Sequence, residues 1–317
     1  MTREELTSEY GLTRYPFDRD ELVPPKTKDE PDLYARVDGF ANARQKIDET
    51  VDAAKSQVNV MVHGPEGCGR SSIVNYIIHR ARPPEPGHSY QRFQVSIPDH
   101  RDLYPLQLTF RVIRKWMRKN LLNLLDPHKE FFDDLEKCVV DSKEPPGVER
   151  AEDLFTRCRT ILAGQKLWPA LIFENVRTPT QFEKVIDAFQ DVPVVLFTAT
   201  TSPAAPEVRS AFFNRHAPDF VVDVTELKLE DVTKFLEQRF ETLGGGGPHP
   251  FDPAGVEEIF GGRGWSFKTT VNLLGDSFDS YAGELAAGGA LKPRIPVETL
   301  RKQAVIFYKL QRPGEPL

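Results

Sequence analysis

A chain of 317 residues, of which 39% are hydrophobic and 28% charged, is long enough for about two domains with their own cores. Its 41 basic and 47 acidic residues give a net charge of -6, which excludes a chain-wide positive field that attracts nucleic acid. Three cysteines, Cys68, Cys138 and Cys158, do not make a disulfide framework. Because the sequence shows no signal-peptide core and no run of about 18 apolar residues, we expect a soluble cytoplasmic protein with no membrane partner.

The first 39 residues are polar and rich in proline, so we expect an N-terminal extension that lies on the first domain, anchored by residues 10–12 and 15–17. Beyond it, apolar runs of strand length alternate with stretches of helical period, which predicts a parallel sheet covered by helices. The predicted strands are 58–62, 93–97, 167–173, 192–197 and 220–224, and the predicted helices between them are 71–80, 103–125, 180–189 and 205–214. From residue 229 onward only helices are predicted, with a glycine run at 244–247.

The turn after the first predicted strand has the composition of a phosphate-binding loop. It consists of Gly64, Pro65, Glu66, Gly67, Cys68, Gly69, Arg70, Ser71 and Ser72. Glycines let successive backbone N–H groups curl around phosphate oxygens, a cation reaches the terminal phosphates, and the Ser71 hydroxyl is placed to bind Mg²⁺. Arg70 stands where lysine is usual, and its planar guanidinium differs in shape from an ammonium. A glycine-rich turn that touches no ligand is the alternative, but the flanking strand and helix favour the phosphate loop.

Glu174 ends the apolar strand predicted at 167–173, and it is followed by Asn175. A carboxylate at the end of such a strand is suited to bind Mg²⁺, although a strand that ends in a polar turn is the alternative. Asn175 stands where nucleotide-hydrolysing proteins carry a second acid that activates water. An amide does not accept that proton.

These residues resemble an AAA+ ATPase, most closely the branch with ExeA-type and TniB/TnsC-type proteins, with the Orc-type initiators further out. Residues 10–17 are similar to the Phe-Gly-Leu-x-x-x-Pro-Phe start of ExeA-type proteins. The resemblance implies a three-layer αβα P-loop NTPase domain at 40–224 and a C-terminal helical lid domain at 225–317, after an extension at 1–39. The loop and Glu174 then look like Walker A and Walker B.

The resemblance also assigns roles to residues beyond the loop. On the strand at 194–201, Thr200 is the candidate for sensor 1, which reads the terminal phosphate. Arg215 is the first candidate for an arginine finger that reaches a neighbouring subunit, and Arg209 is the second. A solvated arginine at the end of a helix explains these residues equally well. The segment 261–274 is similar to the one that carries sensor 2, but Lys268 or Arg263 must replace the expected arginine.

Three departures, Arg70, Asn175 and the missing sensor 2 arginine, remove hydrolytic machinery and keep the markers of the fold. The resemblance therefore implies an ATP-binding and Mg²⁺-binding assembly or regulatory module with weak or absent hydrolysis, acting as a homo-oligomer or with a protein partner. One alternative is an active ATPase that remodels DNA-bound complexes, as in transposition or initiation. Another is a STAND-type signalling switch, because residues 174–176 also resemble the Walker B of that family.

The helix predicted at 103–125 carries basic side chains at helical spacing, which are Arg111, Arg114, Lys115, Arg118 and Lys119. In the DNA-binding AAA+ proteins that the chain resembles, elements near this position face a central channel, so this stripe is a candidate for contact with the DNA backbone. A solvated helix face is the simpler explanation and the one we favour from sequence.

Overall fold

The computed structural model describes residues 1–17, 44–45, 47–49, 51, 58–96, 105–124, 127–141, 148–174, 176, 192, 194–199, 221–244 and 248–311. They fall into two compact units. The sheet unit lies within the ranges 46–64 and 77–223, and the loop–lid unit lies within 1–45, 65–76 and 224–317. The domain boundaries after residues 39 and 224 stay predictions.

The sheet unit is built on five parallel strands in the order β2-β3-β4-β1-β5. Their bounds are β1 Val58–His63, β2 Ser89–Ser96, β3 Leu167–Glu174, β4 Val194–Ala199 and β5 Val221–Asp223. Consecutive residues of β1 and β3 are buried on both faces, which is typical of strands inside a parallel sheet. β2 is an edge strand and its first half is only partly buried. Its residues 89–92 are polar, so the apolar pattern predicted that the strand begins at residue 93.

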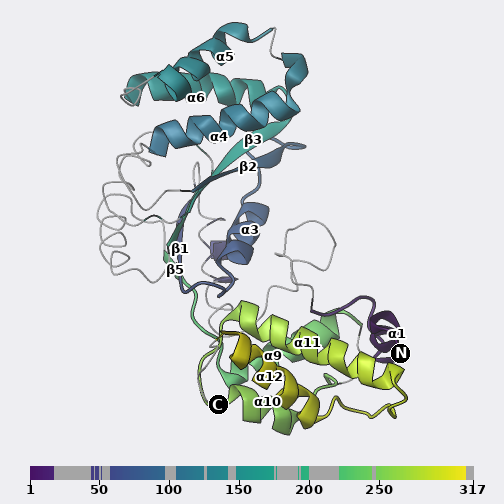
Figure 1. Cartoon of the computed structure of the whole chain (residues 1–317). Helices are drawn as coiled ribbons and strands as arrows, with labels where there is room; N and C mark the ends of the chain where they lie inside the picture. Colours follow the sequence, from purple (N-terminus) through teal and green to yellow (C-terminus); the bar gives the residue numbers. More distant parts are fainter. Residues whose placement is uncertain are drawn as a thin grey trace. The chain divides into compact units, whose positions relative to one another are not determined.

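Helices cover this sheet and extend beyond it. They are α3 Arg70–Arg80, α4 Pro105–Asn120, α5 Lys129–Glu136 and α6 Val148–Ala163, with a 3-10 turn at Leu122–Leu124 and a π-helical turn at Lys137–Asp141. Figure 1 shows α4, α5 and α6 gathered beside β2 and β3. The buried face of α4, with Phe110, Ile113 and Met117, joins the same core as Phe93 and Phe173 of the strands. The helices predicted at 180–189 and 205–214 lie outside the described residues.

The loop–lid unit contains α1 Arg3–Glu9, α9 Leu229–Thr242, α10 Pro253–Phe260, α11 Phe267–Ala286 and α12 Val297–Gln311, together with the start of α3. Asp252 caps α10 by accepting a hydrogen bond from the Ala254 N–H at 2.9 Å, and Pro253 at the first helical position needs no acceptor. Ser266 caps α11 in the same way through the Thr269 N–H at 3.1 Å. These two lid helices, α10 and α11, therefore begin where the sequence places a capping side chain.

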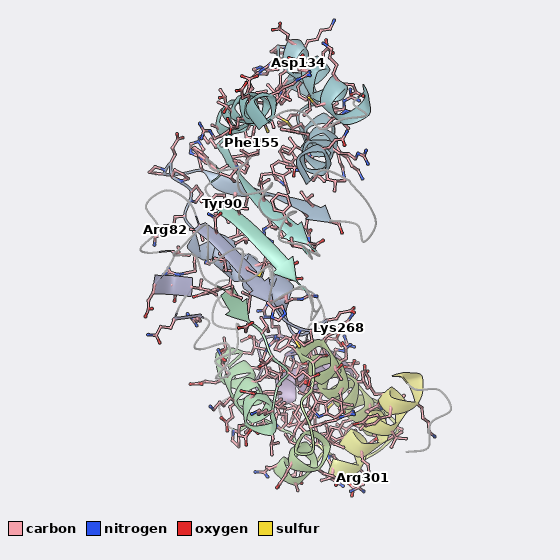
Figure 2. All side chains as sticks on the ribbon, turned by 90° about the vertical axis from the view of Figure 1, so that its left-hand side faces the viewer. Arg82, Tyr90, Asp134, Phe155, Lys268 and Arg301 are labelled. Atoms are coloured by element: carbon pink, nitrogen blue, oxygen red, sulfur yellow. The ribbon has the colours of Figure 1, made fainter. Side chains whose placement is uncertain are left out.

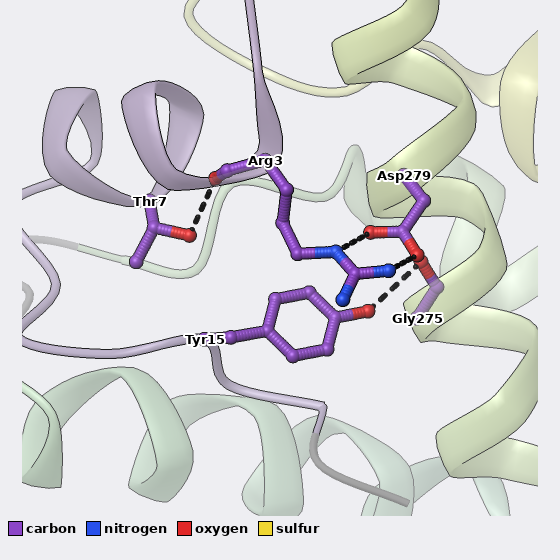
Figure 3. A network of polar contacts seen from close by, with 5 residues as sticks. All are labelled: Arg3, Thr7, Tyr15, Gly275 and Asp279. Atoms are coloured by element: carbon purple, nitrogen blue, oxygen red, sulfur yellow. Dashed lines mark hydrogen bonds and ion pairs between the residues drawn. The ribbon is translucent and has the colours of Figure 1, made fainter.

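The N-terminal segment packs on the lid helices, so the expectation that it lies on the αβ domain is wrong for residues 1–17. Arg3 of α1 makes a two-pronged ion pair with Asp279 of α11, and its guanidinium stands 4.4 Å from the centre of the Tyr15 ring. The Tyr15 hydroxyl donates to the Gly275 carbonyl at 3.2 Å (Figure 3). A Cβ on Gly275 would lie 3.0 Å from that hydroxyl, so only glycine admits so close an approach.

Phe17 is the main apolar anchor of this segment, because it is fully buried and its ring lies 5.7 Å from that of Phe251 and 6.1 Å from that of Phe278. Next to it, the buried Arg239 donates to the Pro16 carbonyl at 2.7 Å and stacks on the Phe235 ring at 5.0 Å. The N-terminal segment thus supplies part of the hydrophobic core of the lid.

Candidate functional site

The loop that follows β1 turns through two residues in the left-handed region, Gly67 at φ 77° and Gly69 at φ 90°, which favour glycine. It then enters α3 at Arg70. Among the described residues, the backbone N–H groups of Gly69, Ser71 and Ser72 have no hydrogen-bond acceptor. The first turn of α3 carries no acid. Unpaired donors at the positive end of a helix suit an anion, so the loop has the properties that a phosphate group requires.

Of the two sensor 2 candidates, the structure brings Lys268 to this loop. The Lys268 backbone N–H donates to the Gly67 carbonyl at 2.8 Å. Figure 2 shows Lys268 at the start of α11, where its side chain is exposed and makes no ion pair within the described part of the chain. Arg263 is engaged elsewhere, because its guanidinium stacks on Trp265 at 4.4 Å and bonds the hydroxyl of Tyr308.

Glu174 belongs to the sheet unit, where it is the last residue of β3 and accepts a hydrogen bond from Gln94 Nε2 at 2.9 Å. β4 pairs with both β3 and β1, and all three strands run in parallel. Their carboxyl ends therefore lie at one edge of the sheet, the edge where parallel α/β sheets bind ligands. The loop leaves β1 at Gly64 from this same edge.

Four predicted residues, Asn175, Thr200, Arg209 and Arg215, lie outside the described residues, and their roles stay predictions. The basic stripe on α4 is described in full. Arg114 and Arg118 both pair with Glu136 of α5, Arg118 at 2.7 Å. The remaining three cations, Arg111, Lys115 and Lys119, are exposed and spaced four residues apart, and in the described part of the protein they have no acidic partner.

The sequence did not reveal that His63 and Asp223 pair. His63 ends β1 one residue before the loop, Asp223 ends β5, and His63 Nδ1 lies 3.0 Å from Asp223 Oδ1. The two residues are partners in the parallel register of the strands. A histidine before the first glycine and an aspartate after an apolar run were visible in the sequence. Their pairing depended on the strand order, which the sequence did not give.

No family model and no curated protein matches the chain. Among solved structures, it is similar to the Aeropyrum pernix ORC2 protein in its ADPNP–ADP complexes, with a TM-score of 0.54 and 14% identity over 92% of this chain and 71% of that one. It is also similar to the Aeropyrum pernix ORC1 protein in complex with DNA, with a TM-score of 0.51 and 13% identity over 92% of this chain and 69% of that one. The chain has an Orc-like AAA+ fold.

The AAA+ fold confirms the α/β class and the helical lid at the C-terminal end that the sequence predicted. At these identities the likeness shows the fold alone. Within the described residues, none of the helices combines the length and the apolar character needed to cross a membrane.

Proposed function

We propose that this AAA+ protein binds a nucleotide, ATP with Mg²⁺, at residues 64–72 and acts as an assembly or regulatory module with weak or absent hydrolysis. The unpaired N–H groups of Gly69, Ser71 and Ser72 at the start of α3 are the observation that supports nucleotide binding most. The exposed ammonium of Lys268, whose backbone bonds the same loop, adds a cation for the terminal phosphate. The ORC2 neighbour, whose structure is that of its ADPNP–ADP complexes, has the same fold.

The chain also carries the groups for the metal and the phosphates. The Ser71 hydroxyl and the Glu174 carboxylate would hold Mg²⁺, which neutralises phosphate charge when bound. Arg70, the first residue of α3, would pair with phosphate oxygens through its guanidinium. Thr200 takes the position of sensor 1 in this proposal.

Three features support weak hydrolysis. Asn175 has no basic oxygen of carboxylate strength to take a proton from water. Arg70 replaces the usual lysine. Finally, Arg263, the only arginine in the segment similar to sensor 2, is held by Trp265 and Tyr308. In a homo-oligomer, Arg215 would reach the nucleotide of the next subunit. Nucleotide binding would therefore promote the assembly of subunits.

The test is a titration with a fluorescent ATP analogue and Mg²⁺, with phosphate release and particle size followed on the same preparation. We expect saturable binding, growth in particle size and turnover below about 1 s⁻¹, the low end of typical enzymes. Faster turnover favours the active ATPase that remodels DNA-bound complexes. Binding without a change of size overturns the assembly role. A partner domain encoded nearby would favour the STAND-type switch. Absence of binding overturns the proposal.

We further propose that α4 contacts the DNA backbone, because Arg111, Lys115 and Lys119 form an exposed stripe with no acidic partner among the described residues. The ORC1 neighbour was solved in complex with DNA. Three phosphate contacts predict a slope of about -3 in a plot of log affinity against log salt, and therefore a loss of about 40-fold between 50 and 200 mM salt.

The variant Arg111→Ala/Lys115→Ala/Lys119→Ala tests this surface by fluorescence anisotropy with duplex DNA. We expect it to lose both the affinity and the salt dependence. The matched control, Arg114→Ala/Arg118→Ala, removes the two arginines that pair with Glu136, and we expect a smaller change in the slope. Equal slopes for the unmodified chain and the triple variant would show that α4 is only a solvated face.

A further inference from the structure

The peptide groups of the phosphate loop point in two directions. Their N–H groups at Gly69, Ser71 and Ser72 have no acceptor in the part of the chain that the structure describes. The Gly67 carbonyl, in contrast, accepts a hydrogen bond from the lid, since the Lys268 N–H donates to it at 2.8 Å. We propose that the loop completes the N-terminal cap of the lid helix α11, so that the lid holds the loop in its phosphate-binding shape before a ligand arrives.

The donors at the start of α11 show why the cap needs the loop. The first four N–H groups of a helix have no acceptor in the preceding turn. Ser266 satisfies one of them, since its side chain accepts from the Thr269 N–H at 3.1 Å, while its carbonyl accepts the first regular helical bond, from the Thr270 N–H, at 3.0 Å. The Lys268 N–H is left to Gly67. The next residue of the loop carries a sulfur atom.

That sulfur belongs to Cys68, which is only 1% exposed. Burial raises the pKa of the Cys68 thiol, and a backbone hydrogen bond from Phe267 acts in the opposite direction by stabilising the thiolate. The Lys268 N–H, which Ser266 leaves unpaired, is therefore bonded by the loop. A loop that moved away would leave the Lys268 N–H of α11 unpaired.

Gly67 shows how closely the two segments approach. A Cβ at this position would stand 3.1 Å from Ser266 Oγ and 3.2 Å from the Lys268 Cβ, which is closer than side chains normally pack. In addition, its φ of 77° is unfavourable for any other residue. Gly67 is thus required by the contact with the lid as well as by the curvature of the loop.

Cys68 provides a reporter of this contact, because a thiol reacts with alkylating reagents only when it is accessible and ionised. Alkylation with N-ethylmaleimide, read by peptide mass spectrometry, follows every cysteine separately in the unmodified chain. Cys158 is the internal control for global unfolding, because it is fully buried in the sheet unit and burial raises its pKa to about 12.

Two variants open the cap from opposite sides, Gly67→Ala on the loop and Ser266→Ala on the lid. We expect each to raise the alkylation rate of Cys68 by about tenfold, the effect of losing one cap or one hydrogen bond, and to speed deuterium exchange at the amides of residues 267–270. The matched control is Asp252→Ala, which removes the cap of another lid helix, α10. It should leave Cys68 unchanged.

Unchanged alkylation of Cys68 in both variants overturns the proposal. So does an equal acceleration at Cys68 and Cys158, because the loop would then open only when the whole chain unfolds. So does an Asp252→Ala variant that matches Ser266→Ala, because Cys68 would then respond to any weakening of the lid.

The effect on ligand binding rests on the proposed nucleotide function and has its own readout. If ATP selects the loop shape that the lid holds, ATP with Mg²⁺ slows the alkylation of Cys68, and Ser266→Ala weakens ATP binding by a similar factor. Equal ATP affinity in the Ser266→Ala variant overturns the coupling. A chain that binds no ATP but shows the expected Cys68 and exchange results overturns the nucleotide function and leaves the cap in place.

Discussion

The sheet unit and the loop–lid unit position their functional residues by different means. In the sheet unit, the parallel register of β1, β4 and β3 brings Gly64 and Glu174 to one edge, and each position follows from a local run of apolar residues. In the loop–lid unit, the contacts join segments more than two hundred residues apart, such as Phe17 with Phe251. The first arrangement depends on strand pairing and the second on an aromatic core that several segments share.

The difference has consequences for stability. Loss of one side chain from a sheet strand leaves the ladder of backbone hydrogen bonds in place. The N-terminal segment has no such ladder, because α1 is a helix of seven residues, and helices this short depend on tertiary packing. Its attachment to the lid therefore depends on a few side chains.

The largest effect is expected for Phe17→Ala, which removes the fully buried ring at the centre of the lid core. Truncation of a buried phenylalanine costs about 3–5 kcal/mol of unfolding free energy. We expect deuterium exchange to accelerate in α9 and α11, where Phe240 and Phe278 contact this ring, and to stay slow in β1, β3 and β4.

The matched variant is Phe110→Ala on α4, because this side chain is equally buried in the core of the sheet unit. It should give the reverse pattern, with faster exchange around α4 and protected lid helices. If both variants loosen both units to the same extent, the two units do not fold as separate entities and the contrast between them is wrong.

The same contrast decides what the sequence could reveal. The apolar runs predicted four of the five described strands to within two residues at each end, because a buried parallel strand consists of consecutive apolar residues. The prediction for β2 began four residues late, since the first half of this edge strand is polar. The α6 helix was missed, although Leu154, Phe155, Cys158, Ile161 and Leu162 repeat at helical spacing in the sequence. This spacing is sufficient to predict the helix.

The loop was predicted from its glycines, but its contact with α11 was not. Nothing in the residues around Gly67 indicates that Ser266 and Lys268 lie against it, because the contact uses backbone atoms and the absence of a side chain. Likewise, the sequence left Lys268 and Arg263 as equal candidates. The structure separates them through Trp265 and Tyr308, an aromatic pair 5.9 Å apart at the centres of their rings.

A smaller effect is expected where the N-terminal segment is held by charge. Arg3→Ala removes the ion pair with Asp279 and the stacking on Tyr15 (Figure 3). Because the Arg3 side chain is 48% exposed, water screens the pair, and we expect a loss of about 1 kcal/mol from the two interactions together. Urea denaturation measures this loss of unfolding free energy. The control is the loss on breaking the exposed ion pair between Glu258 and Arg301 on other lid helices. A loss above that of Phe17→Ala would make charge, and not packing, the main anchor.

In the sheet unit, the comparable polar contact joins the short strand β5 to β1. Asp223→Ala and His63→Ala each break the contact between His63 Nδ1 and Asp223 Oδ1, and the double variant completes a thermodynamic cycle. We expect a coupling free energy of about 0.5–1 kcal/mol in thermal unfolding, because both side chains are partly exposed. Zero coupling would show that the three-residue register of β5 is sufficient without its terminal pair.

The smallest expected effect is an acid-sensitive contribution from Asp134 on α5. A side-chain hydrogen bond from Arg157 lowers the pKa of this carboxyl below its ordinary value of 3.8, while burial opposes the shift. Because the folded-state pKa is the lower one, the contribution to stability is present above about pH 4 and is lost as the pH falls through the folded-state value. We expect Asp134→Asn to reduce the unfolding free energy at pH 7 by less than about 1 kcal/mol, since the group is near the surface. Below pH 4, the unfolding free energies of the variant and the unmodified chain should become more similar. Chemical denaturation at pH 7 and pH 3 measures this. A stability difference between the variant and the unmodified chain that grows in acid would show that the ionised form of Asp134 does not stabilise α5 against α6. The contact between the two helices would then depend on the packing of Phe131 and Phe155 in the core of the sheet unit.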